Sequence, residues 1–265
     1  MTDRPILYSA AMVRALLAGT KIQTRRILKP QPYSNGFHFD GHDILCHIDD
    51  LPPSAMLMDR GKGKNRYTIS NMEDGPEGMS GVYVGDRLWV REAWRTFVSL
   101  DAVPPRDLLQ PGRGAGILYE ADDGGLAITA AGERSMGERD DRRAFGKLRP
   151  GLFMPRWASR LTQVVTDVRV QRLQDISEED AIAEGVGCVE IGSGYRARYT
   201  VLANSWADVV EQNVVSWTDA RDAYAALWDE INGPGSWDAN PWVAAYTVET
   251  HRCNIDAMPG GEGSQ

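Results

Sequence analysis

The sequence predicts an α+β fold, in which a small β-barrel has helices across its openings and is interrupted by long loop insertions. Three observations lead to this fold class. Apolar and β-branched residues alternate with others between positions 160 and 173, which is typical of a long strand with one buried face. Ser9 and Ser177 stand directly before short helical patterns, where serine is a good cap. Several further strand patterns are short and separated by stretches rich in glycine, proline, serine and aspartate.

The first two elements are a strand and a capped helix. Residues 5–9 predict a short strand, and Ser9 then caps a helix that ends at Gly19. Residues 30–83 have little periodicity and are the first expected insertion. A turn followed by a strand pattern at residues 85–92 marks the return of regular structure.

The middle of the chain combines a second insertion with the long strand and a short helix. Residues 97–147 are the second expected insertion, and residues 101–116 and 121–150 are expected to be loop-like around a short strand at residues 117–120. After the long strand, Ser177 to Asp180 match a capping box, and the helix that it opens is expected to stop at Gly185.

The C-terminal part contains a third insertion, a helix and a last strand. Residues 187–217 are the insertion, Thr218 is the expected cap of the helix, and residues 242–250 are the strand. Residues 253–265 form an expected flexible tail. Because the sequence has no internal repeat and most of its extra length falls in insertions, we predict one domain over residues 1–252.

The composition is that of a globular protein with an acidic surplus. The 265 residues include 29 basic and 37 acidic ones, for a formal net charge of -8. No apolar run reaches the roughly 18 residues of a membrane helix, and the first residues do not begin a signal peptide. Three cysteines, an odd number, argue against a disulfide framework. We therefore expect a cytoplasmic protein with no membrane partner, and the charge disfavours a protein that coats DNA.

This charge is unevenly distributed along the chain. Residues 1–30 contain six basic residues and one acidic residue, whereas residues 175–265 contain sixteen acidic and four basic ones. Such polarity is typical of a basic binding face on an acidic body. The alternative is that the acidic residues simply lie on solvated helices and loops.

The segment from Lys21 to Arg26 is the first candidate for chemistry. Mutual repulsion of Lys21, Arg25 and Arg26 favours a neutral lysine, which is a nucleophile or general base. Thr24 offers a hydroxyl to a substrate carbonyl. In a regular strand Lys21 and Thr24 point to opposite faces, so a shared site requires a turn or bulge. The alternatives are a solvated basic strand and a phosphate-binding patch.

Two carboxylates are further candidates. Glu184 falls in the last turn of its helix, where the helix dipole disfavours an acid, so it either pairs with Lys21 or holds a substrate amine, or is simply exposed. Glu92 is expected to face inward and to need a partner, such as Arg156 or Arg160. These two arginines either present their guanidinium groups to one anion or form structural salt bridges.

Tryptophans adjoin these polar residues, and a weak metal pattern is also present. Trp89, Trp94 and Trp157 are either base-stacking surfaces or parts of the core. The histidines and cysteines lack the paired spacing of structural zinc sites, so we expect no metal and no cofactor. The groups that we considered are His38, His42, Cys46, His47, His251 and Cys253.

Three segments, in their order and spacing, resemble the ASCH domain, a PUA-like β-barrel family associated with RNA and modified nucleosides. They are LAGTKIQTRR at residues 17–26, GDRLWVRE at residues 85–92 and AIAEG at residues 181–185. The longer ASCH proteins of phages and prophages are the most similar, because they also resemble this chain at PRWASR, residues 155–160, and WDANPW, residues 237–242. The resemblance implies a PUA-like barrel.

Small bacterial members of this family are amidohydrolases that remove the acetyl group from N4-acetylcytidine. The resemblance places their catalytic lysine, threonine and glutamate on Lys21, Thr24 and Glu184. It implies that Lys21 activates a water or attacks the amide carbonyl, Thr24 polarises that carbonyl, and Glu184 transfers protons to the leaving amine. Candidate residues around a small modified nucleoside are Arg25, Arg26, Trp89, Glu92, Arg156, Trp157 and Arg160.

Two other functions stay open from the sequence. A non-catalytic protein that binds RNA, single-stranded nucleic acid or modified bases would use the basic N-terminal segment and the tryptophans. A ribonuclease, or a phage protein that acts on a host partner, would place its function in the insertions. A shared fold does not decide between these activities.

Overall fold

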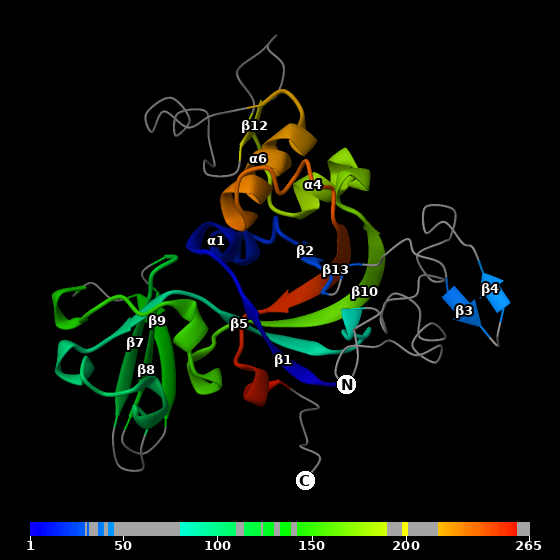
Figure 1. Ribbon diagram of the computed structural model, residues 1–265. Coiled ribbons are helices and arrows are strands. Elements are labelled where there is room, and N and C mark those ends of the chain that lie inside the picture. Colours follow the sequence, from blue (N-terminus) through cyan, green and yellow to red (C-terminus); the bar gives the residue numbers. More distant parts are fainter. Residues whose placement is uncertain are drawn as a thin grey trace. The chain divides into compact units, whose positions relative to one another are not determined.

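The computed structural model divides the chain into two compact units (Figure 1). Unit 1 comprises Met1, Thr20–Asp86 and Val165–Val248, and unit 2 comprises Thr2–Gly19, Arg87–Val164 and Glu249–Gln265. The structure describes residues 1–29, 31, 37–39, 42–44, 80–109, 114–122, 124–129, 133–138, 142–189, 198–200 and 217–258. None of the helices in these ranges is long and apolar enough to cross a membrane.

The fold is mixed α+β, as predicted, with more sheet than helix. The largest sheet has the strand order β1-β5-β10-β13-β2, in which β1 runs parallel to β5. These strands are β1 (Asp3–Leu7), β2 (Gln23–Ile27), β5 (Arg87–Arg91), β10 (Thr162–Arg172) and β13 (Trp242–His251). Because β1 and β2 are the edges of this order, no pairing between described strands closes the expected barrel.

Three smaller sheets complete the described strands. A four-stranded sheet has the order β6-β7-β8-β9, and two hairpins pair β3 with β4 and β11 with β12. The strands are β3 (Phe37–Phe39), β4 (His42–Ile44), β6 (Trp94–Thr96), β7 (Ala115–Tyr119), β8 (Gly124–Ile128), β9 (Arg134–Glu138), β11 (Gly187–Val189) and β12 (Arg198–Thr200). The two hairpins fall inside the expected insertions 30–83 and 187–217, most of which lies outside the described residues.

The helices begin and end close to the predicted positions. In unit 2, α1 (Ala10–Ala18) is capped by the side chain of Ser9 and ends at Gly19. In unit 1, α4 (Glu178–Ala183) is capped by Ser177, and α6 (Ala220–Asn232) is capped by Asp219 and not by the expected Thr218. Short 3-10 helices are η3 (Val98–Leu100), η4 (Pro105–Asp107), η5 (Arg142–Ala144), η6 (Gly151–Phe153), η7 (Arg156–Ala158), η8 (Leu173–Asp175) and η9 (Ile255–Ala257).

Each unit has its own hydrophobic core. In unit 1, α4 and α6 lie side by side and bury Ala181, Tyr224 and Trp228 together with Val243 of β13 (Figure 1). The expected single-faced alternation along β10 is wrong in its middle, because Thr166 is exposed and Val165 is buried. Two consecutive exposed residues, at 166 and 167, separate the two buried parts of the strand.

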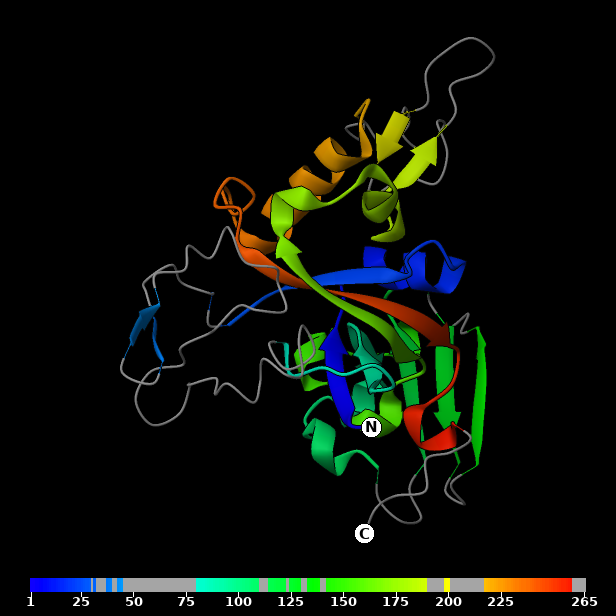
Figure 2. The ribbon, with the colours of Figure 1, turned by 90° about the vertical axis from the view of Figure 1, so that its right-hand side faces the viewer.

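The core of unit 2 lies on a sheet that the sequence analysis missed. The expectation that residues 121–150 are loop-like is wrong, because β8 and β9 extend the sheet from β7 (Figure 2). Burial of Ile117, Leu126 and Trp94 in one cluster stabilises this arrangement. The side chain of Asp122 accepts a hydrogen bond from the backbone N–H of Gly124 at the β7–β8 turn. An aspartate–glycine turn between two apolar runs was the available signal.

The chain remains ordered beyond the last strand. Ile255 of η9 is fully buried, and the Thr162 hydroxyl donates to the carbonyl of Cys253 at 3.0 Å. Residues 253–258 of the expected flexible tail therefore pack within unit 2, and residues 259–265 lie outside the described part. The prediction of one domain stays a prediction, since β10 and β13 each run through both units.

A substitution at Gly19 tests whether its left-handed backbone is needed to end α1. Its backbone has φ 76°, a left-handed conformation, with no atom within 4 Å of an added Cβ. We expect Gly19→Ala to lower the free energy of unfolding by about 1–2 kcal/mol through backbone strain alone. The measurement is urea unfolding. Gly137→Ala in β9 is the matched control, because Gly137 has equal space and no positive φ. Equal effects of the two substitutions would contradict this account.

Candidate active site

Lys21 and Glu184 are brought together by backbone contacts in unit 1. A short antiparallel bridge pairs the two residues, and the N–H of Ile22 donates to the carbonyl of Ala183 at 2.8 Å. Glu184 is the C-cap of α4, so the segment that leads into β2 crosses the C-terminal end of this helix. The backbone pairing thus places the two side chains next to one another.

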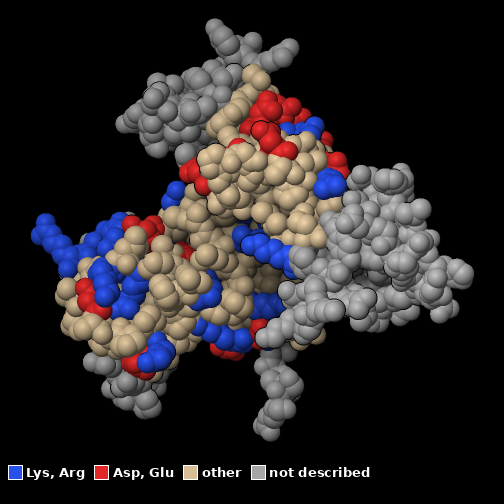
Figure 3. Space-filling view, viewed as in Figure 1, with Lys and Arg blue, Asp and Glu red and all other residues tan. Residues whose placement is uncertain are grey.

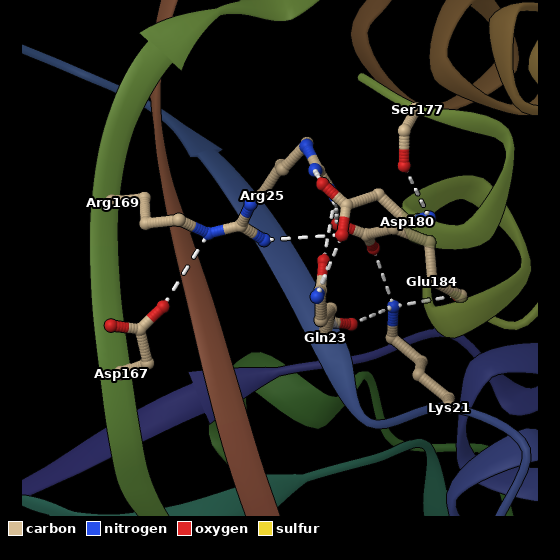
Figure 4. A network of polar contacts seen from close by, with 8 residues as sticks. All are labelled: Lys21, Gln23, Arg25, Asp167, Arg169, Ser177, Asp180 and Glu184. Atoms are coloured by element: carbon tan, nitrogen blue, oxygen red, sulfur yellow. Dashed lines mark hydrogen bonds and ion pairs between the residues drawn. The ribbon is translucent and has the colours of Figure 1, made fainter.

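The ammonium group of Lys21 is enclosed by oxygen atoms (Figure 4). Its Nζ donates to Glu184 Oε2 at 2.7 Å, to the carbonyl of Glu184 at 2.8 Å and to the carbonyl of Gln23 at 2.8 Å. The side chain of Lys21 is 0% exposed and that of Glu184 is 3% exposed. The expectation that Glu184 pairs with Lys21 is confirmed, and neither residue belongs to a solvated surface.

Arg25 extends this contact into a buried network. It donates to Glu184 Oε1 at 3.0 Å and to Asp180 Oδ2 at 2.7 Å, so each oxygen of Glu184 has its own cation. Gln23 donates to Asp180 Oδ1 at 2.9 Å, and Arg169 of β10 donates to the same atom at 3.1 Å. Two cations of β2 and its approach therefore bind two acids of α4 and its C-cap (Figure 4).

The environment shifts the proton affinities of this network. Burial lowers the pKa of Lys21, and the charge of Glu184 offsets this only in part. Burial raises the pKa of Asp180, but hydrogen bonds from Arg169 and Gln23 and the charge of Arg25 outweigh it, so the net shift is downward. Tyr224 of α6 hydrogen-bonds Glu184, and burial followed by that negative charge raises the pKa of its phenol.

Thr24 is not brought to the pair. Lys21, Gln23 and Arg25 all contact the acids of α4 and its C-cap, so Thr24 lies on the opposite face of β2 by strand alternation. Thr24 is buried opposite Tyr246 of β13, and in the described part of the chain its hydroxyl makes no hydrogen bond with Lys21 or Glu184. Arg26 shares this opposite face and is half-buried.

Four residues of the network were not singled out from the sequence, namely Gln23, Arg169, Asp180 and Tyr224. Gln23 follows Lys21 at the strand spacing of two, and Asp180 was noted only as part of a capping box. The backbone N–H of Asp180 donates to Ser177 Oγ at 3.1 Å, as expected for a cap. The carboxylate of Asp180 accepts a hydrogen bond from Arg25. Tyr224 fitted the apolar stripe of α6. Only Gln23 had a signal in the sequence, its alternation with Lys21 and Arg25.

The other predicted carboxylate belongs to a separate ion cluster in unit 2. Arg160 donates to both oxygens of Glu92 at 2.9 Å, and its remaining contacts reach Asp122 at 2.8 and 3.0 Å. Its guanidinium also lies 4.1 Å from the ring centre of Tyr119. Burial raises the pKa of Glu92 despite the opposing effect of Arg160. This confirms the expected arginine partner of Glu92.

Arg156 and Arg160 do not converge on one anion. Arg156 donates to Asp3 at 2.6 Å and to Asp256 at 2.6 Å, whereas Arg160 binds the Glu92 cluster. Arg87 binds the same Asp3 at 2.8 Å, so these residues tie β1, β5 and the segment after β13 into unit 2. Arg156 thus forms structural salt bridges, one of the two alternatives left by the sequence.

The predicted tryptophans are not exposed stacking surfaces. Trp94 is fully buried in the core of unit 2, and Trp157 packs against the same cluster. Trp89 is buried, with the guanidinium of Arg91 5.2 Å from its ring centre. These residues therefore serve packing in the structure.

The surface charge agrees only in part with the expected basic face on an acidic body. Acidic side chains gather over the region of α4 and α6, consistent with solvated acids on helices (Figure 3). The basic N-terminal segment is not one exposed face, because Lys21 and Arg25 are buried and paired. Within the described residues, no group of three or more histidine, cysteine or acidic side chains is placed to hold a metal. Cys46 and His47 lie outside them.

Comparisons with known proteins add no family to this geometry. No protein-family model matches the chain, and no characterised protein or solved structure matches it significantly. Functional conclusions therefore depend on the residues and their contacts.

The ion pairs of Asp180 should make the free energy of unfolding sensitive to acid. Because its folded pKa lies below the ordinary 3.8, its contribution is complete above that value and is lost as the pH falls through the folded pKa. We expect Asp180→Asn to lower the free energy of unfolding at neutral pH by about 1.5–3 kcal/mol, since charge-assisted hydrogen bonds are lost. The difference from wild type should shrink towards pH 2 in urea titrations.

The control for Asp180 is Asp167→Asn. Asp167 is largely exposed and lies 3.4 Å from Arg169, so we expect a change of less than about 1 kcal/mol. If the difference in the free energy of unfolding between Asp180→Asn and wild type stayed constant from pH 7 to pH 2, it would not come from the ionised carboxylate of Asp180.

Proposed function

We propose that this chain is an ASCH-type amide hydrolase that removes the acyl group from N4-acylated cytosine nucleosides, with Lys21 and Glu184 as the reacting pair. The observation that carries the proposal is the 2.7 Å contact between Lys21 Nζ and Glu184 Oε2, from residues 163 positions apart. Independent burial of either residue would not have produced it. The two residues are those onto which the resemblance placed a catalytic lysine and glutamate.

The environment of Lys21 suits base catalysis. An amine accepts a proton only when it is neutral, and burial lowers the pKa of Lys21 towards that state. Glu184 is the acceptor at hand for the proton that Lys21 gives up. A buried structural ion pair has the same geometry, so the distinguishing property is turnover and not the contact itself.

The proposed reaction balances its protons through this pair. Transfer of a proton from Lys21 to Glu184 leaves a neutral amine and a carboxylic acid. The amine takes a proton from water as the water oxygen bonds to the amide carbon, and the acid of Glu184 protonates the N4 nitrogen as the C–N bond breaks. The products are a carboxylic acid and cytidine, and the resting ammonium and carboxylate are restored. Direct attack by Lys21 on the carbonyl requires the same neutral amine.

The proposal has a structural requirement for access. Because the side chain of Lys21 is closed to solvent, the C-terminal end of α4 must move away from the start of β2 for substrate to reach Nζ. The carbonyl-polarising role of Thr24 stays a prediction from the resemblance, to be tested by Thr24→Val. The five-stranded sheet with α1, α4 and α6 is the part that we assign to a PUA-like fold.

A binder of RNA or modified bases has less support. Lys21 and Arg25, which were expected on its basic surface, are buried and paired with Glu184. Arg156 and Arg160 are also paired with carboxylates. The tryptophans that were expected to stack on bases are buried or packed against the core. Gel-shift titration at low salt would revive this function if it gave a complex while N4-acetylcytidine was not hydrolysed.

Lys21→Arg separates catalysis from structure. Arginine keeps the positive charge beside Glu184 but does not deprotonate in proteins. We expect kcat/KM for N4-acetylcytidine to fall by about 10²–10⁴-fold. Because a larger guanidinium must fit a closed site, we expect the free energy of unfolding to fall by about 1–3 kcal/mol, which urea titration measures separately. Lys29→Arg, a change of an exposed lysine nearby in sequence, should leave turnover unchanged. Absence of cytidine release by wild type, or full activity of Lys21→Arg, would refute the proposal.

The pH profile tests the state of Lys21. The reactive pair carries one proton, because Lys21 acts as the base only while Glu184 holds the proton that it later gives to N4. Burial lowers the pKa of Lys21 from the ordinary 10.5. We therefore expect kcat/KM to fall as the pH rises through a midpoint below 10.5, where the pair loses this proton, after subtraction of the uncatalysed hydrolysis. A midpoint at or above the value of a free lysine would show that this side chain is not the titrating base.

A further inference from the structure

Unit 2 contains a cavity that shares no residue with the Lys21 pair. Its volume is about 460 Å³, within the range of sites for small organic molecules. The described residues that line it all belong to unit 2, and they come from α1, the β7–β8 turn, β8, β9 and the segments that flank β10 and β13. The cavity therefore needs an explanation of its own.

The apolar walls of this cavity are aliphatic. Leu126 of β8 and Met136 of β9 are direct partners in the strand register, so both side chains lie on the same face of the sheet. Leu17 adds half-buried aliphatic surface, whereas Leu126 and Leu161 are almost fully buried. Met136 is 56% exposed although it faces this cavity, and no aromatic ring is among the described lining residues. This lining suits an alkyl body and offers no stacking surface for a base.

Two arginines give the cavity a cationic part. Arg134 of β9 donates one Nη2 hydrogen bond to the carbonyl of Trp157, and Arg252 donates one to the carbonyl of Leu17. A guanidinium has five N–H donors, so each arginine is anchored and retains donors for a ligand. Neither arginine forms a salt bridge with an acid in the described ranges.

The other charged residues of the lining, Arg160 and Asp122, already form ion pairs. Arg160 is paired with Glu92 and with Asp122. Burial raises the pKa of Asp122, but the hydrogen bond from Arg160 and the nearby positive charges, including that of Arg252, outweigh it and lower the pKa overall. With Arg160 neutralised by Glu92, the two arginines and Asp122 leave one net positive charge on the lining. An anion therefore gains more than a neutral or cationic ligand.

Two polar residues of the lining, Ser159 and Asn254, are held by hydrogen bonds to the backbone. The buried amide of Asn254 donates to the carbonyls of Arg156 and Ser159 at 2.9 and 2.8 Å. The hydroxyl of Ser159 donates to the carbonyl of Val90 at 2.9 Å. These polar groups are satisfied internally, so recognition is left to the arginines and the aliphatic walls.

We propose that this cavity binds a small amphipathic anion, with an alkyl body against Leu17 and Met136 and a carboxylate or phosphate against Arg134 and Arg252. The shared chemistry is an oxyanion on an aliphatic chain. Fork-shaped guanidinium donors match either head group, so the head is distinguished by experiment.

Isothermal titration of the full chain with octanoate and with octyl phosphate tests this site. We expect saturable one-to-one binding of at least one anion, and at least tenfold weaker binding of 1-octanol and of inorganic phosphate. The anion that binds more tightly identifies the head group. No binding of either anion, or equal binding of 1-octanol, would overturn the proposal.

Variants connect the binding to this cavity. We expect Arg134→Gln combined with Arg252→Gln to raise Kd at least tenfold, and Met136→Asp to do the same by placing a charge on the apolar wall. All three residues have exposed or half-exposed side chains, so folding should be retained. Arg106→Gln, an exposed arginine outside the cavity, should leave Kd unchanged. Unchanged affinity in the arginine double variant would refute the site.

This inference stands apart from the proposed hydrolase function. Because Lys21 does not line the cavity, Lys21→Arg should bind the anion with wild-type affinity even if it hydrolyses nothing. Failure of hydrolysis with intact anion binding would therefore count against the first proposal alone, and the reverse result would count against the second alone.

Discussion

The buried contact of Glu184 with Lys21 and Arg25 is the constraint on which unit 1 depends. Each carboxylate oxygen has one cation, and both cations come from the segment that opens β2. Removal of charges from water is costly, and the cost is offset only when geometry and hydrogen bonding are nearly complete. The end of α4 and the start of β2 must therefore keep their register, and the core formed by α4 and α6 is built beside it.

Unit 2 solves the same electrostatic problem with different residues. Glu92 is buried against the planar guanidinium of Arg160, and Asp122 supplies a second carboxylate. The ring of Tyr119 covers the guanidinium, which joins this polar group to the apolar core of the four-stranded sheet. Glu92 and Arg160, which the sequence suggested as substrate contacts, thus bind each other. Their charges are largely neutralised by ion pairs inside unit 2.

The two proposed sites differ in how they relate to solvent. The Lys21 pair is closed, with altered proton affinity, which suits proton transfer after a local movement. The cavity of unit 2 is a preformed space with anchored arginines, which suits binding without chemistry. A protein with both properties has separate residues for reaction and for small-molecule recognition, so each can be altered independently.

Local physics made part of this structure predictable from the sequence. Ser9, Gly19 and Ser177 define helix ends because capping depends on neighbouring residues, and strand periodicity located β5, β10 and β13. Clustered cations and the end of a helix singled out Lys21 and Glu184, and the resemblance grouped them with Thr24 as a catalytic set. Tertiary structure alone decided that Asp180 joins Arg25, that Thr24 faces away, that β8 and β9 extend a sheet, and that arginines surround a cavity. Those features depend on contacts between residues far apart in the chain, for which local periodicity and propensity carry no information.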